Sequence, residues 1–205
     1  LVTFNISDSK PIKIFKEDIP KGKLIEYLIA RSYLPVFKSS KIIDNKYYMD
    51  GGVYDNLPTD MLLDKNYDKI YAVRTKAIGV TKKIKDDRIV YINPTQKLGS
   101  IIVFDPVKAK QNINLGYYDT LRVIDNLDGY KYYIKPKKDT YYEELFKNLT
   151  PYDLNKLRLE FGTINKKLLA IKLVEKLATE FKIEQFRVCS FNTLLFKVKL
   201  LIDED

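Results

Sequence analysis

Residues 47–58 read Tyr-Tyr-Met-Asp-Gly-Gly-Val-Tyr-Asp-Asn-Leu-Pro, the most distinctive stretch of the chain. An apolar run ends at Asp50, and Asn-Leu-Pro begins a new segment after the two glycines. On its own, Asp-Gly-Gly is typical of a tight turn, because glycine adopts positive φ angles without steric cost. In a functional interpretation, Gly51 and Gly52 let another backbone approach, and Asp50 holds a fixed carboxylate at a strand end. Such a carboxylate can orient or deprotonate a serine hydroxyl.

Strands and helices are predicted on both sides of this stretch. Alternating or β-rich apolar residues predict strands over 2–6, 12–15, 41–43, 46–49, 69–74, 88–92 and 130–134. Helical spacing and capping residues predict helices over 21–33, 58–63, 106–124, 163–181 and 191–202, with short helices beginning at Thr140 and Thr150. The segment 191–202 could also be a strand. The chain is therefore mixed α/β up to about residue 130 and mainly helical after it.

Composition excludes several kinds of catalytic and metal site. The 205 residues contain no histidine and one cysteine. A Ser-His-Asp triad, a Cys-His pair and a His-ligated metal site cannot be built from this chain. A single cysteine also excludes an internal disulfide and a Cys-rich zinc site. We expect no metal and no cofactor.

The charge of the chain is basic but spread out. There are 36 Lys and Arg residues against 27 Asp and Glu, and only six of the 36 are arginine. Nucleic-acid recognition favours clustered arginine and aromatic stacking motifs, so we expect no nucleic-acid partner. Weak contact with an anionic membrane surface is the better alternative. No apolar run approaches the ~18 residues of a membrane span, and we expect a cytoplasmic protein, membrane-peripheral at most.

Four other side chains have simpler interpretations than a role in chemistry. Asp55 is either a second carboxylate of a site or, more in keeping with its position, a turn residue. Ser32 is expected to end a helix, and Cys189 to be a small buried side chain. The pair Asp86-Asp87 is typical of a solvated loop rather than of a metal site.

Several motifs, taken in order, resemble the patatin-like phospholipase family. The matching residues are Ala30, Ser32, Pro35 and Phe37 at a helix end, then Asp50-Gly51-Gly52, Asn56 and Pro58, and the strand 70–73. Arg31 departs from the pattern, because the family usually has a small residue there. Residues 104–121 resemble a helix that follows the core in bacterial members. The resemblance is good over residues 1–125 and loose over 140–200.

The resemblance implies a three-layer α/β fold and a lipid acyl hydrolase with a Ser-Asp dyad. Residues 1–130 would be the C-terminal portion of the catalytic domain, and 131–205 a mainly helical extension. Asp50 would be the dyad aspartate, with Gly51, Gly52, Asn56 and Pro58 shaping the site. The substrate would be a phospholipid or lysophospholipid, hydrolysed without a metal.

The family's nucleophile is a serine in Gly-x-Ser-x-Gly, and none of the eight glycines here forms that pattern. Because residues 1–6 already alternate like a strand, we expect the chain to be a fragment, inactive alone, with the serine upstream. The alternative is a non-catalytic patatin-like module that binds lipid or a partner.

Overall fold

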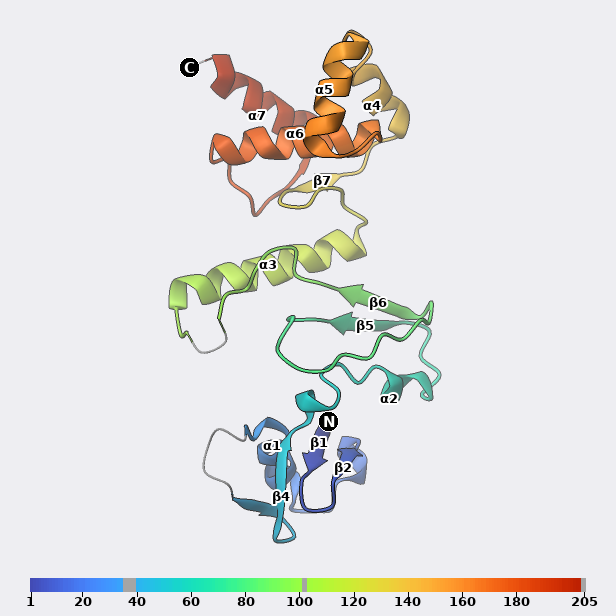
Figure 1. Ribbon diagram of the computed structural model, residues 1–205, viewed down its shortest axis with the longest axis vertical. Coiled ribbons are helices and arrows are strands. Elements are labelled where there is room, and N and C mark those ends of the chain that lie inside the picture. Colours follow the sequence, from blue (N-terminus) through green and yellow to red (C-terminus); the bar gives the residue numbers. More distant parts are fainter. Residues whose placement is uncertain (35–39, 101–102, 204–205) are drawn as a thin grey trace. The chain divides into compact units, whose positions relative to one another are not determined.

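A computed structural model describes residues 1–34, 40–100 and 103–203 (Figure 1). Pro35 and Phe37 of the family motif lie outside the described residues. Two compact units divide the chain, Leu1–Asn93 and Pro94–Asp205. The described residues form seven α-helices and several small sheets, so the chain is mixed α/β as predicted. The three-layer arrangement and the division at residue 130 stay predictions.

The first unit contains an antiparallel sheet and a parallel strand pair. The sheet has the order β2-β1-β4-β3, and β5 pairs with β6. The elements are β1 (Val2–Asn5), β2 (Lys10–Lys13), the 3-10 helix η1 (Lys16–Asp18), α1 (Leu24–Ser32), β3 (Lys41–Ile43), β4 (Lys46–Asp50), the 3-10 helix η2 (Gly51–Val53), α2 (Asp60–Leu63), β5 (Ile70–Val73) and β6 (Ile89–Ile92).

The β3-β4 hairpin follows from local sequence. Asp44 and Asn45 connect the strands with φ angles of 47° and 60°, which these two residue types tolerate better than most. On the sheet, Ala30 of α1 packs against Ile43 and Tyr48. The two predicted strands, 41–43 and 46–49, are confirmed, and β4 runs one residue further, to Asp50.

The central strand β1 buries its polar side chains. Thr3 and Asn5 are almost inaccessible to solvent, whereas Ile6 just beyond the strand is exposed. The Thr3 hydroxyl lies 2.9 Å from the carbonyl oxygens of both Ala30 and Met49, to which it donates. Hydrogen bonding of this hydroxyl therefore ties α1 to β1 and β4.

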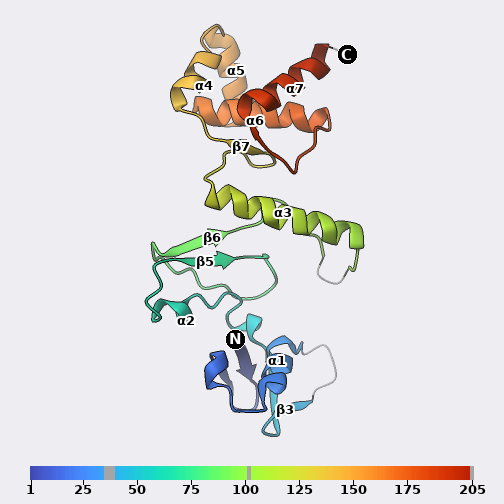
Figure 2. The same ribbon diagram turned by 180° about the vertical axis from the view of Figure 1, so that it is seen from behind.

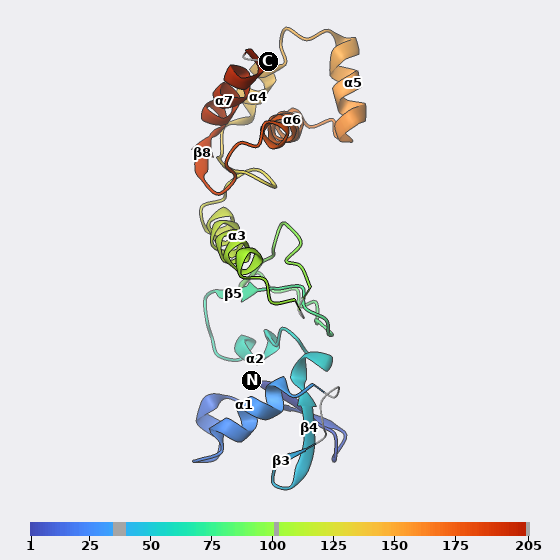
Figure 3. The same cartoon turned by 90° about the vertical axis from the view of Figure 1, so that its left-hand side faces the viewer.

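The second unit is mainly helical, with one parallel strand pair, β7-β8. Its elements are α3 (Pro106–Ile124), β7 (Tyr133–Lys135), α4 (Asp139–Leu145), α5 (Pro151–Phe161), α6 (Lys166–Glu180), β8 (Val188–Ser190) and α7 (Phe191–Asp203). Figure 2 shows α4, α5 and α7 gathered around α6, with which each of them packs. Figure 3 shows β8 leading directly into α7, so residues 191–202 are helical rather than a strand.

Two local predictions in this unit are wrong. The strand predicted to begin at residue 130 begins at Tyr133, because the Glu175 carboxylate accepts the N–H groups of Tyr130, Lys131 and Tyr132 at 2.8–2.9 Å. Thr140 does not cap α4, which begins one residue earlier. By contrast, Thr150 caps α5 by accepting from the Asp153 N–H.

Candidate active site around Asp50

The backbone of Asp50 is held by two other elements. Asp50 is the last residue of β4 and pairs with Thr3 of β1. Its N–H donates to the Tyr33 carbonyl oxygen at 2.7 Å, directly after α1 ends. The end of β4 is therefore anchored to a neighbouring strand and to the end of a helix. The predicted position of Asp50 at a strand end is confirmed.

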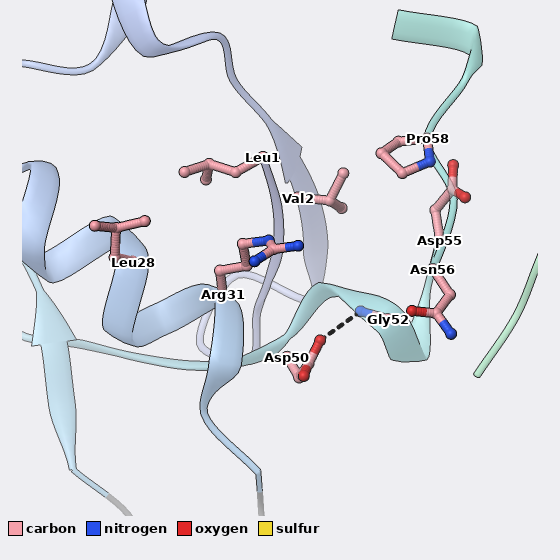
Figure 4. A pocket seen from close by; sticks show the side chains of 9 residues that line it. All are labelled: Leu1, Val2, Leu28, Arg31, Asp50, Gly52, Asp55, Asn56 and Pro58. Carbon is pink, nitrogen blue, oxygen red and sulfur yellow. Dashed lines mark hydrogen bonds between the residues drawn. The ribbon is translucent and has the colours of Figure 1, made fainter. Parts of the chain in front are cut away.

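One of the two carboxylate oxygens of Asp50 is held by a hydrogen bond. Its Oδ1 accepts the Gly52 N–H at 2.7 Å, which caps η2 (Figure 4). Within the described part of the chain, no group donates to its second oxygen, Oδ2. This carboxylate thus has a set orientation and one oxygen free to accept a proton or a hydrogen bond.

Gly51 and Gly52 are required for space rather than for their φ angles. Neither has a positive φ, so the interpretation as a turn that needs glycine for its φ angles is wrong. A Cβ atom at Gly51 would lie 2.1 Å from the Val2 carbonyl oxygen. At Gly52 it would lie 3.1 Å from oxygens of Asn56 and Asp50. Close backbone approach at Gly51, by β1, is the reason for glycine there.

Asn56 connects the Asp50 loop to the segment 77–80. Its N–H donates to the Val80 carbonyl oxygen at 2.7 Å, and its Nδ2 lies 3.4 Å from the carbonyl oxygens of Ala77 and Ile78. The Val80 N–H donates back to Gly52 at 3.1 Å. Asn56 does not cap α2, whose N-cap is Thr59. The role of Asn56 is to join two loops.

Asp55 is a turn residue and also half of a buried ion pair. Its Oδ1 accepts the Leu57 N–H at 3.2 Å, which confirms the turn role. Its Oδ2 lies 3.0 Å from the Lys13 Nζ, and the Asp55 side chain is fully buried. Lys13 also binds Asp60 at 2.5 Å, and Lys82 approaches Asp55 at 3.8 Å.

Lys13 and Asp60 of this cluster stabilise each other in their charged forms. Burial alone would lower the pKa of Lys13, but hydrogen bonds to Asp60 and Asp55 outweigh burial and raise the pKa. Burial would likewise raise the pKa of Asp60, but Lys13 lowers it overall. Sequence patterns do not reveal these partners, because Lys13 lies 42 residues before Asp55.

Asp50 lines an open cavity of about 390 Å³. The walls come from β1, α1 and the loop after β4 (Figure 4). They consist of Leu1, Val2, Leu28, Arg31, Asp50, Gly52, Asp55, Asn56 and Pro58. The structure therefore brings Asp50, Gly52, Asn56 and Pro58 together at one cavity, while buried Gly51 lies beneath it.

The remaining candidate side chains have structural roles. The Ser32 hydroxyl donates to the Leu28 carbonyl oxygen within α1 at 3.1 Å. Burial raises the pKa of Cys189, which keeps it a thiol. Asp86 binds the Arg88 guanidinium at 2.8 Å. Across residues 1–34, 40–100 and 103–203, no acidic, Cys or His cluster could hold a metal ion, and no helix is both long and apolar enough to cross a membrane.

Comparisons with known proteins bear on the first part of the chain. Neither curated proteins nor solved structures give a match. The family model described as "Patatin-like phospholipase" matches residues 1–63. The matched segment contains the end of β4, Gly51, Gly52 and the Asn56-Leu57-Pro58 motif. Over residues 1–63 the chain thus matches the patatin-like phospholipases, a family of lipid acyl hydrolases.

Proposed function

We propose that this chain is part of a serine acyl hydrolase of the phospholipase A or lysophospholipase type, with Asp50 as the aspartate of a Ser-Asp dyad. The observation that carries the proposal is the Asp50 carboxylate, oriented by the Gly52 N–H and open at Oδ2 inside a cavity. It lies in the segment that matches the family. The patatin-like three-layer sheet is part of this proposal.

The chemistry requires a serine from outside these 205 residues, because the chain has no Gly-x-Ser-x-Gly. As the serine Oγ attacks the ester carbonyl, its proton passes to Asp50 Oδ2 and a tetrahedral intermediate forms. When the intermediate collapses, the C–O bond of the ester breaks and the leaving alkoxide takes that proton. Water then attacks the acyl-serine and loses a proton to Asp50. The bond between the acyl carbon and the serine Oγ breaks, the serine Oγ takes that proton back, and the fatty acid is released.

The other elements prepare Asp50 for this role. An ordinary Asp has a pKa near 3.9 and is a weak base, so its orientation and a preorganised oxyanion site must supply much of the rate. The Gly52 N–H holds one oxygen, which leaves the other to face the serine. Gly51 lets β1 pass directly beneath. No histidine is needed in this scheme.

The experiment is Asp50→Asn in the complete protein that contains this chain. We expect ester hydrolysis to fall about 10²–10⁴-fold, as on loss of a general base. Asp68→Asn is the matched control, because Asp68 is an exposed aspartate in the same unit. Circular dichroism checks that both variants fold. Near wild-type hydrolysis by the Asp50→Asn protein would overturn the role of Asp50.

The absence of the nucleophile motif from this sequence favours one second candidate, a non-catalytic lipid-binding module. A fluorophosphonate probe separates the two. The probe labels an activated serine in a hydrolase, and we expect one labelled serine in the complete protein. No labelling and no ester hydrolysis would establish the binding module instead.

A further inference from the structure

A second cavity, of about 320 Å³, lies at the carboxyl end of β5. It is lined by Asn56, Leu57 and residues of the segment 73–81, all in the first unit. Ligands of parallel sheets bind outside the carboxyl ends of strands, where loops rather than strand pairing satisfy the backbone. The position therefore suits a ligand, and the lining defines which kind.

The two cavities differ in the charged side chains that line them. Asp50, Asp55 and Arg31 line the first, whereas Arg74 and Lys76 line the second, which within the described residues has no carboxylate in its wall. An anion would meet two carboxylates beside one guanidinium in the first cavity, but two cations and no described carboxylate in the second. Electrostatics thus favours an anionic ligand in the second cavity.

Arg74 is not engaged by other side chains. Its backbone N–H donates to Ile92, but its guanidinium forms neither a hydrogen bond nor an ion pair with any described residue. Lys13 and Lys82 differ, since both contact Asp55 and Asp60. A guanidinium without a partner, lining a cavity, is available for a ligand that accepts two parallel hydrogen bonds.

The loop after Arg74 adds neutral donors. The backbone N–H groups of Thr75, Ala77 and Gly79 donate to none of the described residues, and the Thr75 and Thr81 residues also line the cavity. Guanidinium, backbone N–H and hydroxyl groups together are the donor set that binds phosphate oxygens.

The segment that lines the second cavity is joined to the Asp50 loop by several close contacts. Asn56 lines both cavities. Gly79 lies so close to Gly52 that a Cβ atom on Gly79 would come 2.3 Å from the Gly52 carbonyl oxygen. The hydrogen bond from Val80 to Gly52 fixes the same contact. A group bound in the second cavity is consequently positioned relative to Asp50.

We propose that this second cavity binds a phosphate group, with the Arg74 guanidinium as its main ligand. Resting on the function proposed above, the phosphate is the one in the headgroup of the lipid substrate, whose ester lies at Asp50. A neutral glyceride has no such group, so Arg74 selects phospholipids over glycerides.

The kinetic test compares Arg74→Gln with wild type in the complete protein. The substrates are a lysophospholipid and a monoacylglycerol of the same acyl chain. We expect the KM for the lysophospholipid to rise about 10–100-fold, as on loss of a charged hydrogen-bond pair, with the monoacylglycerol unchanged. Arg74→Lys should recover part of the loss, and Arg187→Gln, at an exposed arginine, is the matched control. Equal losses on both substrates, or none, would overturn the headgroup assignment.

A binding test does not depend on catalysis. Calorimetry measures inorganic phosphate and glycerophosphocholine binding to wild type and to Arg74→Gln. We expect both to bind wild type and to bind Arg74→Gln at least tenfold more weakly. If phosphate does not bind wild type, the cavity proposal is overturned whether or not the protein hydrolyses esters. If only inorganic phosphate binds, the source is free phosphate and not a headgroup.

Discussion

The two units of the chain are stabilised in different ways. In the described residues of the second unit, twelve buried side chains form one continuous apolar cluster. The first unit instead has two separate clusters of three buried residues each, around Ile43 and Ile70. It also buries polar side chains, namely Thr3, Asn5, Asp55 and Thr59. Burial of apolar side chains therefore dominates in the second unit. The first unit depends more on close contacts between backbone segments and on hydrogen bonds of buried polar side chains.

This difference explains where the candidate site lies. A catalytic carboxylate must be held with one oxygen exposed, which an apolar core does not provide. The first unit holds Asp50 by a strand end, a close glycine contact and hydrogen bonds. The second unit has two buried carboxylates of its own, Asp119 and Glu175, and one oxygen of Glu175 accepts three backbone N–H groups. Glu175 therefore holds the loop 130–132 in place.

Truncation in the continuous core should have the largest effect on stability. Leu169 is fully buried in α6, and Leu169→Ala should cost about 2–5 kcal/mol of unfolding free energy. Chemical denaturation followed by hydrogen exchange of α4, α6 and α7 measures it. The matched control is Leu159→Ala, since Leu159 is 85% exposed and should change stability by about 0.5 kcal/mol or less. Equal costs at the two positions would contradict a core-based account.

A methyl group at Gly51 should be the most damaging small change in the first unit. Gly51→Ala would place Cβ 2.1 Å from Val2 and push β1 from β4, at about 1–3 kcal/mol. Hydrogen exchange of the backbone amides of residues 2–5 and 46–50 measures the loss of stability. Gly116→Ala is the control, because nothing lies within 4 Å of its Cβ position in α3. That helical substitution should stabilise by about 0.5–1 kcal/mol, and a stabilising Gly51→Ala would contradict the close approach.

Removing one buried hydroxyl should cost less. Thr3→Val keeps the shape of the side chain but loses the donor to Ala30 and Met49, at about 1 kcal/mol. The end of α1 should then exchange faster than in wild type. Thr3→Ser retains the hydroxyl and should preserve protection at residues 30–33. If the serine variant lost the same protection, the hydrogen bonds would not be the cause.

Acid should produce the smallest effect, at the start of β6. Hydrogen bonds from the side chain and the backbone N–H of Arg88 lower the pKa of Asp86 from 3.8 to about 2. A lowered folded-state pKa means that the ionised form is stabilised by folding. This contribution is complete above pH 3.8 and is lost as the pH falls through about 2. NMR titration of Arg88 measures it, and Asp86→Asn should remove this part of the acid response. A pKa of Asp86 near 3.8 would refute the pairing.

Local sequence predicted those parts of the fold that local contacts decide. The strands on either side of Asp44-Asn45, the helix that begins at Pro106 and the helix capped by Thr150 are set by contacts within a few residues, and these three predictions are confirmed. β8 was not predicted, because only pairing with β7, more than 50 residues earlier, makes it a strand. The predicted start of the strand at residue 130 was wrong for the same reason, since the Glu175 carboxylate that binds this segment is 45 residues from Tyr130.

The candidate site divides in the same way. The motif around Asp50 is contiguous, so it was found from the sequence, and its catalytic role stays a prediction. Lys13 and Lys82 were missed because a lysine on a strand or loop has no local pattern that reveals a buried partner. Arg74 was missed because its cavity forms only when the loop after β5 meets Asn56.

Two properties of the chain follow from its sequence alone: which chemistry is absent and where the chain turns. A chain without histidine excludes imidazole catalysis in any conformation, and capping and turn residues act on neighbouring backbone. Tertiary contacts alone explain why Gly51 is glycine, which oxygen of Asp50 stays free, and why Arg74 and Lys76 line a cavity with no carboxylate among its described lining residues. These properties depend on contacts between residues distant in sequence, and packing alone brings such residues together.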